Sequence, residues 1–375
     1  MLVRENILID LYRKLWSGDR LKKSQWILGL LVFAALAALF VWGRARIHFD
    51  FRVFGSQVAL ADWLKIGFSI ACIYVAYVFR AVRWSLLMRH NKKVPLFSLL
   101  GTQVIGFTAV ALIGRVADPV RPYLVAKKTG EPLSSQIAVY IVERLFDFGT
   151  MALIISSVIL LASTGQLPHH EILRKAGYGG LAVTLLGGLF LFVLRVTGGM
   201  AAALLERVFG IASKKLGAAV GSKVRAFRTG LDTMHNFADF SYSASLSLGM
   251  WLVITLAYWE CMSAFTASPQ LAGTTLVNCI LLLAVSGGVS VLQLPILGWF
   301  SQIAFVAAAL SSFFGVAPEA ATACAATILL ATFISVIPVG LIWAHFEHVS
   351  LRKVTLESEH AEEELVAADL VEPPE

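Results

Sequence analysis

The sequence predicts an all-α polytopic membrane protein with six to eight transmembrane helices. Of the 375 residues, 58% are hydrophobic and only 15% are charged, whereas soluble globular domains carry about 25% charged residues. A transmembrane helix needs about 20 apolar residues. The apolar residues here are grouped into long runs that together allow six to eight crossings: 26–42, 64–88, 136–162, 177–194, 242–265 and 276–343.

The first of these runs, 26–42, follows a basic stretch and therefore has the order of a secretory signal peptide. We expect it to stay in the protein as a first span, for three reasons. The run is long, the charged stretch before it exceeds a usual n-region, and no small-x-small cleavage site follows it.

The distribution of basic residues predicts the orientation of the chain. Segment 1–25 holds six Lys or Arg and the link 195–239 holds seven, whereas the link 266–275 holds none. By the positive-inside rule the first two are cytoplasmic and the third is outside. The link 43–63, with three arginines, departs from this scheme. We therefore expect a multi-pass protein of the cell (inner, cytoplasmic) membrane with both termini in the cytoplasm.

Segment 96–113 does not fit this orientation if it crosses the membrane, because the basic link 195–239 would then lie outside. The segment is also short and contains Gly101, Thr102, Gln103, Gly106 and Thr108. We interpret it as a re-entrant or broken helix buried within protein, which is where irregular backbone is tolerated at membrane depth.

The second half of the sequence contains a possible counterpart of segment 96–113. Ser286-Gly287-Gly288 and Pro295-Ile296-Leu297-Gly298 interrupt the last hydrophobic tract. Paired interruptions in the two halves of a transporter indicate an inverted repeat with a binding site near the midplane. Ordinary helix kinks are the alternative. The helix-break or pathway residues under the first interpretation are Gly287, Gly288, Pro295 and Gly298.

The domain organisation follows from these patterns. A cytoplasmic basic segment, 1–25, precedes a single transmembrane domain, 26–345. Within it, the link 195–240 is expected to be cytoplasmic and amphipathic, because Val224, Phe227, Leu231 and Met234 recur at helical spacing. The tail 346–375 is acidic, ends in Pro-Pro-Glu and is expected to be disordered.

Three groups of charged residues lie within or beside the predicted spans, where a charge costs about 2.5 to 3.5 kcal/mol or more. Each group has a structural explanation: Arg80 and Arg83 can extend to the interface, Arg144 can pair with Asp147 three residues away, and Arg115 and Asp118 can cap a turn. All three groups nevertheless fall on the cytoplasmic side near segment 96–113. Arginine forks bind phosphate well, so we predict one anionic head-group site, with Arg121 in a loop between Pro119 and Pro122. Its members are Arg80, Arg83, Arg115, Asp118, Arg121, Glu143, Arg144 and Asp147.

The order and spacing of these charges are similar to those of a known family. Arg80-x-x-Arg83-Trp84, Gly114-Arg115-x-x-Asp118-x-x-Arg121 and Glu143-Arg144-x-x-Asp147 resemble the lysylphosphatidylglycerol synthase transmembrane (flippase-like) family. Two positions depart from its pattern, where Ile113 stands in place of Pro and Ala117 in place of Gly. The resemblance covers about 64–343, and we expect no soluble aminoacyl-transferring domain. It therefore implies the lipid-translocating half of such a protein.

Two classes of function remain open at this point. The first is a lipid translocase that binds an anionic phospholipid or polyprenyl-phosphate head group from the cytoplasmic leaflet. The second is a membrane-embedded glycosyl- or phosphotransferase in which Glu143 and Asp147 act as acid and base. The near-match to a phosphate loop at 217–223 is one residue short, and no acidic metal cluster is evident. We therefore expect a non-enzyme with no metal and no cofactor. Its expected partners are membrane lipids and not nucleic acid, because the basic residues cluster beside spans.

Overall fold

The computed structural model describes residues 49–88, 94–161, 170–197, 237–290 and 297–351, together with residues 203, 207, 208, 213, 354, 355, 357 and 358. The chain divides into two units, Met1–Phe51 and Arg52–Glu375, and the arrangement given below is that of the second. All regular elements in the described ranges are helical, which confirms the predicted all-α class. The first apolar run and most of the link 195–240 lie outside these ranges, as does Pro295.

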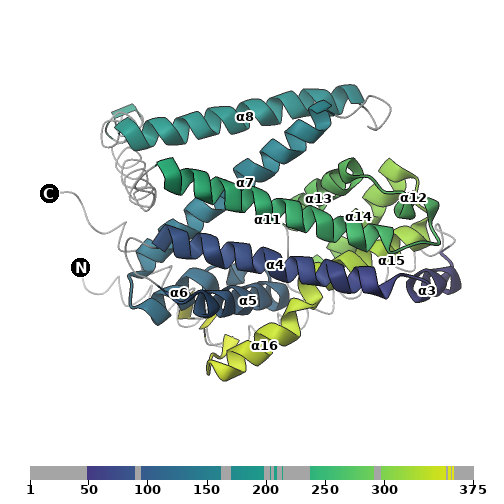
Figure 1. Cartoon of the computed structure of the whole chain (residues 1–375), viewed down its shortest axis with the longest axis horizontal. Helices are drawn as coiled ribbons and strands as arrows, with labels where there is room; N and C mark the ends of the chain where they lie inside the picture. Colours follow the sequence, from purple (N-terminus) through teal and green to yellow (C-terminus); the bar gives the residue numbers. More distant parts are fainter. Residues whose placement is uncertain are drawn as a thin grey trace, which may run out of the picture. The chain divides into compact units, whose positions relative to one another are not determined.

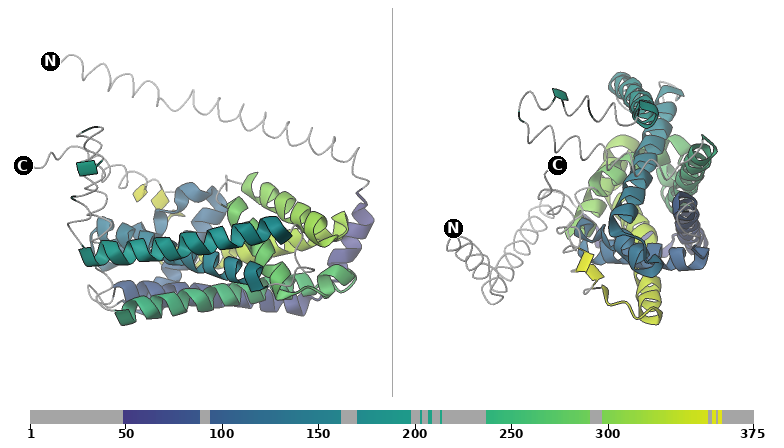
Figure 2. Two further views of the ribbon diagram at one scale, coloured as in Figure 1. Left: turned by 90° about the horizontal axis from the view of Figure 1, so that it is seen from above. Right: turned by 90° about the vertical axis from the view of Figure 1, so that its left-hand side faces the viewer.

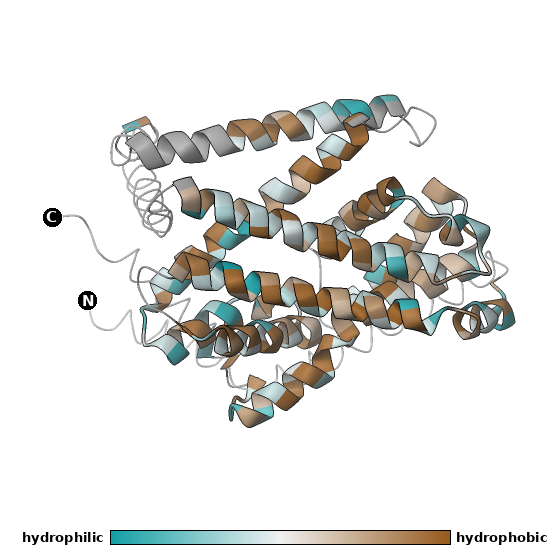
Figure 3. Ribbon diagram, in the orientation of Figure 1, coloured by the Kyte–Doolittle hydropathy of each residue, from teal (hydrophilic) through white to brown (hydrophobic). Residues whose placement is uncertain are grey.

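Four described helical segments are long and apolar enough to cross a membrane: Trp63–Met88, Leu96–Ile113, Ala238–Ser263 and Pro318–Phe346. Hydrophobic residues dominate these segments (Figure 3). Several of their large apolar side chains face outward, including Leu64 at 84% and Phe97 at 73% exposure. Outward-facing apolar side chains on long apolar helices are what lipid contact requires, so the structure agrees with a membrane protein.

Helices α4 (Trp63–Met88) and α11 (Phe237–Ser263) form an antiparallel pair along their length (Figure 1). Near the start of α4, the Lys65 Nζ donates to Ser263 Oγ at 3.2 Å, and the Ser69 hydroxyl donates to the Ala257 carbonyl at 2.8 Å. We use the two ends of α4, the Trp63 end and the Met88 end, as reference points. A short helix, α3 (Phe51–Ala59), precedes α4 at the Trp63 end.

Helices α5 (Leu96–Ile113) and α6 (Val120–Thr129) form a hairpin, which we call the first hairpin. The reversal contains the short helix η1 (Arg115–Ala117) and begins at Gly114, whose φ of 92° favours glycine. Prolines 119 and 122 occupy the start of α6, where a missing backbone N–H costs little. Helix α5 itself is continuous, so segment 96–113 is not broken as one form of the prediction had it; the chain reverses after the helix, at Gly114.

Both ends of the first hairpin lie at the Met88 end of α4. Met88 shares a buried cluster with Leu99 of α5, Val125 of α6 and Val139 of α7 (Leu133–Leu161). The indole of Trp84 donates to Gln136 Oε1 of α7 at 3.2 Å. The end of α4 and the start of α7 are therefore neighbours, although the whole hairpin separates them in sequence. Helix α8 (His170–Thr197) returns along the far end of α7.

Helices α13 (Leu276–Ser290) and α14 (Leu297–Phe314) form a second hairpin at the opposite end (Figure 2). It follows the short helix α12 (Pro269–Ala272). Cys279 near its start and Leu310 near its end share a buried cluster with Ile66 of α4, so both of its ends lie at the Trp63 end. At its inner end the Trp299 indole donates to the Ala111 carbonyl of α5 at 3.0 Å. The two hairpins therefore enter from opposite ends and meet.

The last long helical segment passes beside this meeting point and changes geometry there. Helix α15 (Pro318–Leu329) continues into a π-helical turn, η3 (Leu330–Ile334), and then α16 (Val336–Phe346). The hydroxyls of Tyr74 and Thr108 donate to the Ser335 and Val336 carbonyls at 3.0 and 3.1 Å. These bonds satisfy backbone groups at the irregular turn, which is a common form of helix kink.

The beginning of the C-terminal tail is packed against the first hairpin. The Lys128 Nζ lies 2.6 Å from Glu347 Oε2, and the Tyr123 hydroxyl donates to Glu357 at 2.8 Å. Burial and the bond to Glu357 raise the pKa of Tyr123. Val354 is only 4% exposed. The prediction of disorder from residue 346 onward is therefore wrong for this part, because buried Val354, one ion pair and one hydrogen bond hold it on the first hairpin.

Candidate functional site

Four arginines and two carboxylates form a buried cluster between α4, α6 and α7. The side chains of Arg83, Arg121 and Glu143 are at most 1% exposed, and those of Arg80 and Asp147 are below 10%. Arg144 is the most accessible member at 20%. Because arginine stays protonated in proteins, the cluster holds an excess of two positive charges.

The two carboxylates of α7 connect the arginines of three helices. Glu143 lies 2.9 Å from Arg83 and 3.4 Å from each of Arg80, Arg121 and Arg144. Asp147 lies 2.7 Å from Arg83, 2.9 Å from Arg80 and 3.0 Å from Arg144. Helical spacing explains the arrangement, because residues three or four apart share one helix face. Arg80 and Arg83 thus turn inward from α4, and the alternative in which they extend to the interface is wrong.

Arg121 lies in a polar and aromatic enclosure. Its Nη1 donates to Gln103 Oε1 of α5 at 3.1 Å. Its guanidinium carbon lies 4.6 Å from the ring centre of Phe107 and 4.9 Å from that of Tyr140, within the range of cation–π attraction. A Cβ at Gly106 would overlap the Arg121 side chain, so glycine is needed for this close approach. Arg121 belongs to helix α6 and is fully buried, which corrects its predicted place in a loop.

Several buried hydrogen-bond donors around Arg121 have no partner among the described residues. They are Nε and Nη2 of Arg121, Nε2 of Gln103 and Nε2 of Gln136. The Oε1 atoms of both glutamines are engaged, with Arg121 and with Trp84. Arg121 Nε and Nη2 share one edge of the guanidinium plane, the edge that binds carboxylates and phosphates with two parallel bonds. This part of the cluster therefore has unused donor capacity at a position that excludes water.

The cluster lies well inside the bundle. Arg80 precedes Met88 by eight residues, which is about 12 Å at 1.5 Å per residue. Glu143 follows Leu133 by ten residues, which is about 15 Å. A charge at this depth in an apolar helix bundle is costly unless it is paired, and such residues mark binding sites or transport pathways more often than ordinary packing.

Arg115 and Asp118 lie apart from the other predicted site residues. They pair with each other at 3.5 Å beside the reversal of the first hairpin, with side chains 34% and 21% exposed. The structure thus joins six of the eight predicted residues directly and leaves the Arg115–Asp118 pair outside this cluster.

Three of the four predicted pathway residues lie in the second hairpin, and the fourth, Pro295, lies outside the described residues. Gly287 and Gly288 belong to the last turn of α13, and Gly298 is buried at the start of α14. Gly287 closely approaches Met151 of α7, one turn beyond Asp147. No described contact joins these glycines to the arginine cluster.

Sequence reasoning missed the neutral residues of the site. Gln103, Phe107 and Tyr140 contact Arg121, Gln136 accepts a hydrogen bond from Trp84, and Ser247 of α11 accepts one from Arg83. The two glutamines carried a usable signal, since a polar amide within an apolar helix needs a partner. The aromatic rings carried none, because Phe and Tyr are common at every position of membrane helices.

A polytopic helical membrane protein with two opposed hairpins and a buried arginine–carboxylate cluster is the class that this fold and this site define. The family model of the lysylphosphatidylglycerol synthase transmembrane region matches residues 26–340. The chain therefore belongs to this family, as its charged motifs suggested. Searches of curated proteins and of solved structures each find no significant match.

Proposed function

We propose that this protein is a lipid translocase that binds an anionic lipid head group at the arginine cluster. One observation carries the proposal: the buried donors of Arg121 and Gln103 that have no partner among the described residues, within a cluster whose positive charges exceed its carboxylates. An anion there would accept hydrogen bonds from these donors and neutralise the excess positive charge. Family membership is consistent with a role in lipid metabolism or transport.

The alternative of a membrane transferase is less well supported by the same geometry. A general acid or base needs a carboxyl group that is free to exchange a proton with substrate. Glu143 lies within 3.4 Å of four arginines and Asp147 within 3.0 Å of three. These pairs hold both carboxylates ionised, so their role is to position the arginines.

The opposed hairpins provide the route in this proposal. The first hairpin is re-entrant from the Met88 side, which we assign to the cytoplasm together with both termini. The head group enters beside Arg144, binds Arg121, and moves toward the level at which Trp299 meets Ala111. Rearrangement of the hairpins against the irregular turn of η3 would open the other side, as in transporters built from broken helices.

Cysteine labelling in intact cells tests this topology. The native cysteines of the second unit, Cys72, Cys261, Cys279 and Cys324, are buried and provide a low background. Lys127→Cys on α6 and Ser213→Cys are both exposed and should react with an impermeant reagent only after the cells are opened. Thr266→Cys, exposed at the Trp63 end, should react without opening. Labelling of the Lys127→Cys protein from outside would overturn the re-entrant assignment.

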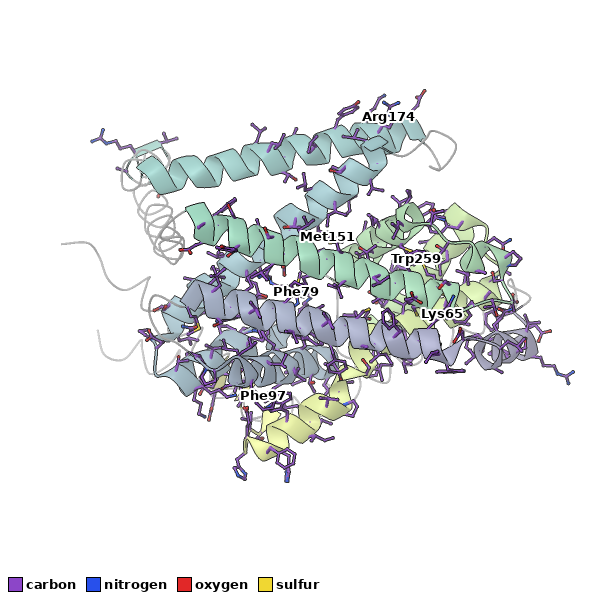
Figure 4. All side chains as sticks on the ribbon, in the orientation of Figure 1. Lys65, Phe79, Phe97, Met151, Arg174 and Trp259 are labelled. Atoms are coloured by element: carbon purple, nitrogen blue, oxygen red, sulfur yellow. The ribbon has the colours of Figure 1, made fainter. Side chains whose placement is uncertain are left out.

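Reconstitution into liposomes tests the function. Movement of a fluorescent anionic lipid between leaflets is measured per folded molecule for the native protein, Arg121→Lys and Arg174→Lys. Arg121→Lys keeps the positive charge but loses the guanidinium edge, Nε and Nη2, that can donate two parallel hydrogen bonds. Transport should therefore fall about ten- to a hundredfold, corresponding to about 1.5 to 3 kcal/mol. Arg174 is exposed near the start of α8 (Figure 4) and is not part of the cluster, so its variant should transport normally.

Arg144→Lys provides a second variant in case Arg121→Lys folds poorly, because Arg144 is partly exposed and a lysine there can reach solvent. It should also slow transport. If both folded cluster variants transport lipid at the native rate, the arginine cluster is not part of the mechanism. If the native protein moves no lipid, the proposed function is wrong.

A further inference from the structure

We infer that the site selects a phosphomonoester head group, a dianion at neutral pH, over the singly charged phosphodiester of common phospholipids. This inference rests on the proposed function and names the chemical class of its substrate. It follows from three independent features of the cluster: its charge balance, the arrangement of its free donors, and the place where it is accessible.

The charge balance is the first feature. Four arginines face two carboxylates within hydrogen-bonding or ion-pairing distance, and the nearby Arg115–Asp118 pair is neutral as a whole. Unpaired charge is costly in an apolar interior, so the most favourable ligand is the one that neutralises the excess completely. A phosphodiester carries one negative charge and leaves one arginine uncompensated. A phosphomonoester carries about −1.5 to −2 at pH 7 and compensates both.

The free donors are the second feature. Three of the groups without a hydrogen-bond partner among the described residues are the Nε and Nη2 edge of Arg121, the amide nitrogen of Gln103, which bonds Arg121, and the amide nitrogen of Gln136, which bonds Trp84 beside Arg121. A phosphomonoester presents three terminal oxygens, which act as strong acceptors. A phosphodiester presents two, and its second ester substituent would need room. The rings of Phe107, Tyr140 and Trp84 lie 4.6, 4.9 and 5.9 Å from the Arg121 guanidinium carbon and so restrict the space beside it.

Accessibility is the third feature. Of the six cluster members, Arg144 is the most exposed, at 20%, and Tyr140 lies against it at 5.3 Å. In this proposal a compact terminal phosphate enters at Arg144 and reaches Arg121, while its lipid chain remains outside. A head group extended by glycerol or an amino alcohol would have to place that extension in the enclosure itself. The geometry thus favours a phosphate at the end of the lipid.

A direct comparison of ligands tests this inference. The full-length protein in detergent is titrated with dioctanoyl phosphatidate, a monoester, with dioctanoyl phosphatidylglycerol, a diester, and with inorganic phosphate. At pH 8 the monoester lipid should bind about tenfold or more tightly than the diester, the difference expected for an additional charge-assisted interaction. Inorganic phosphate should compete with the monoester lipid but bind more weakly, because it lacks the apolar chains.

The pH dependence gives a readout that a purely structural cluster would not produce. Below a second pKa of about 6 the monoester loses one negative charge, whereas arginine does not titrate. The preference for the monoester should therefore shrink between pH 8 and pH 5, while binding of the diester stays constant. Arg121→Lys should reduce monoester binding about tenfold, and Arg174→Lys should not.

The possible outcomes separate this inference from the proposed function. Equal or tighter binding of the diester at pH 8 would overturn the selectivity while leaving an anionic-lipid translocase in place. A preference that does not change with pH would also overturn it. If inorganic phosphate competes and binds as tightly as dioctanoyl phosphatidate, the site is one for free phosphate. If no anion binds, the arginine site of the proposed function fails with it.

Discussion

The two hairpins of this molecule have the same architecture but opposite chemistry. The first hairpin, α5–α6, contributes Gln103 and Arg121 to a cluster of ionised side chains. The second, α13–α14, has a neutral polar contact at a corresponding place. The Ser286 hydroxyl lies 2.7 Å from the Tyr258 hydroxyl of α11, and the Gln302 amide donates to the Ser286 carbonyl at 3.3 Å.

The difference lies in how completely each contact satisfies its own polar groups. The side chains of Tyr258, Ser286 and Gln302 are buried, and none has an unpartnered polar atom among the described residues. The arginine cluster retains free donors and excess charge. A neutral contact whose polar atoms are all hydrogen-bonded holds helices together without a ligand. A charged cluster with free donors favours binding of a ligand that accepts those hydrogen bonds. The anion affinity of the molecule is therefore concentrated in the first hairpin.

Removing a charge from the cluster should have the largest effect. Glu143→Gln removes the carboxylate that four arginines share, and we expect a loss of about 3 to 5 kcal/mol, because uncompensated charge remains buried. Ser286→Ala in the second hairpin should cost only about 1 to 3 kcal/mol, the cost of leaving buried polar partners unmatched. Thermal unfolding in detergent and the yield of folded protein measure both.

A contrast in ligand response sharpens this comparison. Added dioctanoyl phosphatidate should raise the unfolding temperature of Ser286→Ala by as much as it raises that of the native protein. Glu143→Gln has a larger excess of positive charge, so the same lipid should raise its unfolding temperature by more than it does for the native protein. Equal losses of stability in the two variants would mean that the cluster is no more than ordinary packing.

Much of this architecture could be predicted from the sequence, for reasons visible in particular residues. Apolar runs define α4, α7 and α11 because lipid imposes their length. Arg80 with Arg83, and Glu143 with Asp147, were recognisable as pairs on single helix faces. The inward direction of Arg80 and Arg83 was not, because the local sequence is equally compatible with an arginine that extends to the interface. Only the carboxylates of α7, sixty residues later, decide it.

The state of Arg121 shows a different limit. Prolines 119 and 122 suggested a loop, although proline is also common in the first turn of a helix. The enclosure by Phe107 and Tyr140 depends on the reversal at Gly114 and on the close approach of Gly106. These are tertiary features with no periodic signal. Arg115 was grouped with the cluster by its position in the sequence, but the reversal turns it toward Asp118.

Adding one methyl group to the first hairpin should have an intermediate effect. A Cβ at Gly106 would overlap Arg121 Cγ, whereas a Cβ at Gly67 of α4 would meet nothing within 4 Å. Gly106→Ala should therefore displace Arg121, cost about 1 to 3 kcal/mol and weaken monoester binding. Gly67→Ala should be neutral or stabilise the helix by up to about 1 kcal/mol. Intact lipid binding in folded Gly106→Ala would show that the position of Arg121 does not control the site.

The contact between the two hairpins should give the smallest effect. The Trp299 indole donates to the Ala111 carbonyl, near the end of α5, where helix carbonyls lack partners of their own. Trp299→Phe removes this bond and should lower stability by about 0.5 to 1.5 kcal/mol. Trp251→Phe on α11 is the matched control, because the buried Trp251 Nε1 has no partner among the described residues. The control loses a similar amount of ring surface but no hydrogen bond, so the difference between the two unfolding temperatures isolates the contact.

If the hairpins must separate during translocation, Trp299→Phe should also transport lipid at least as fast as the native protein despite its lower stability. A loss of transport in Trp299→Phe alone would mean instead that the hairpins work as one rigid unit, and that the contact between them must be kept.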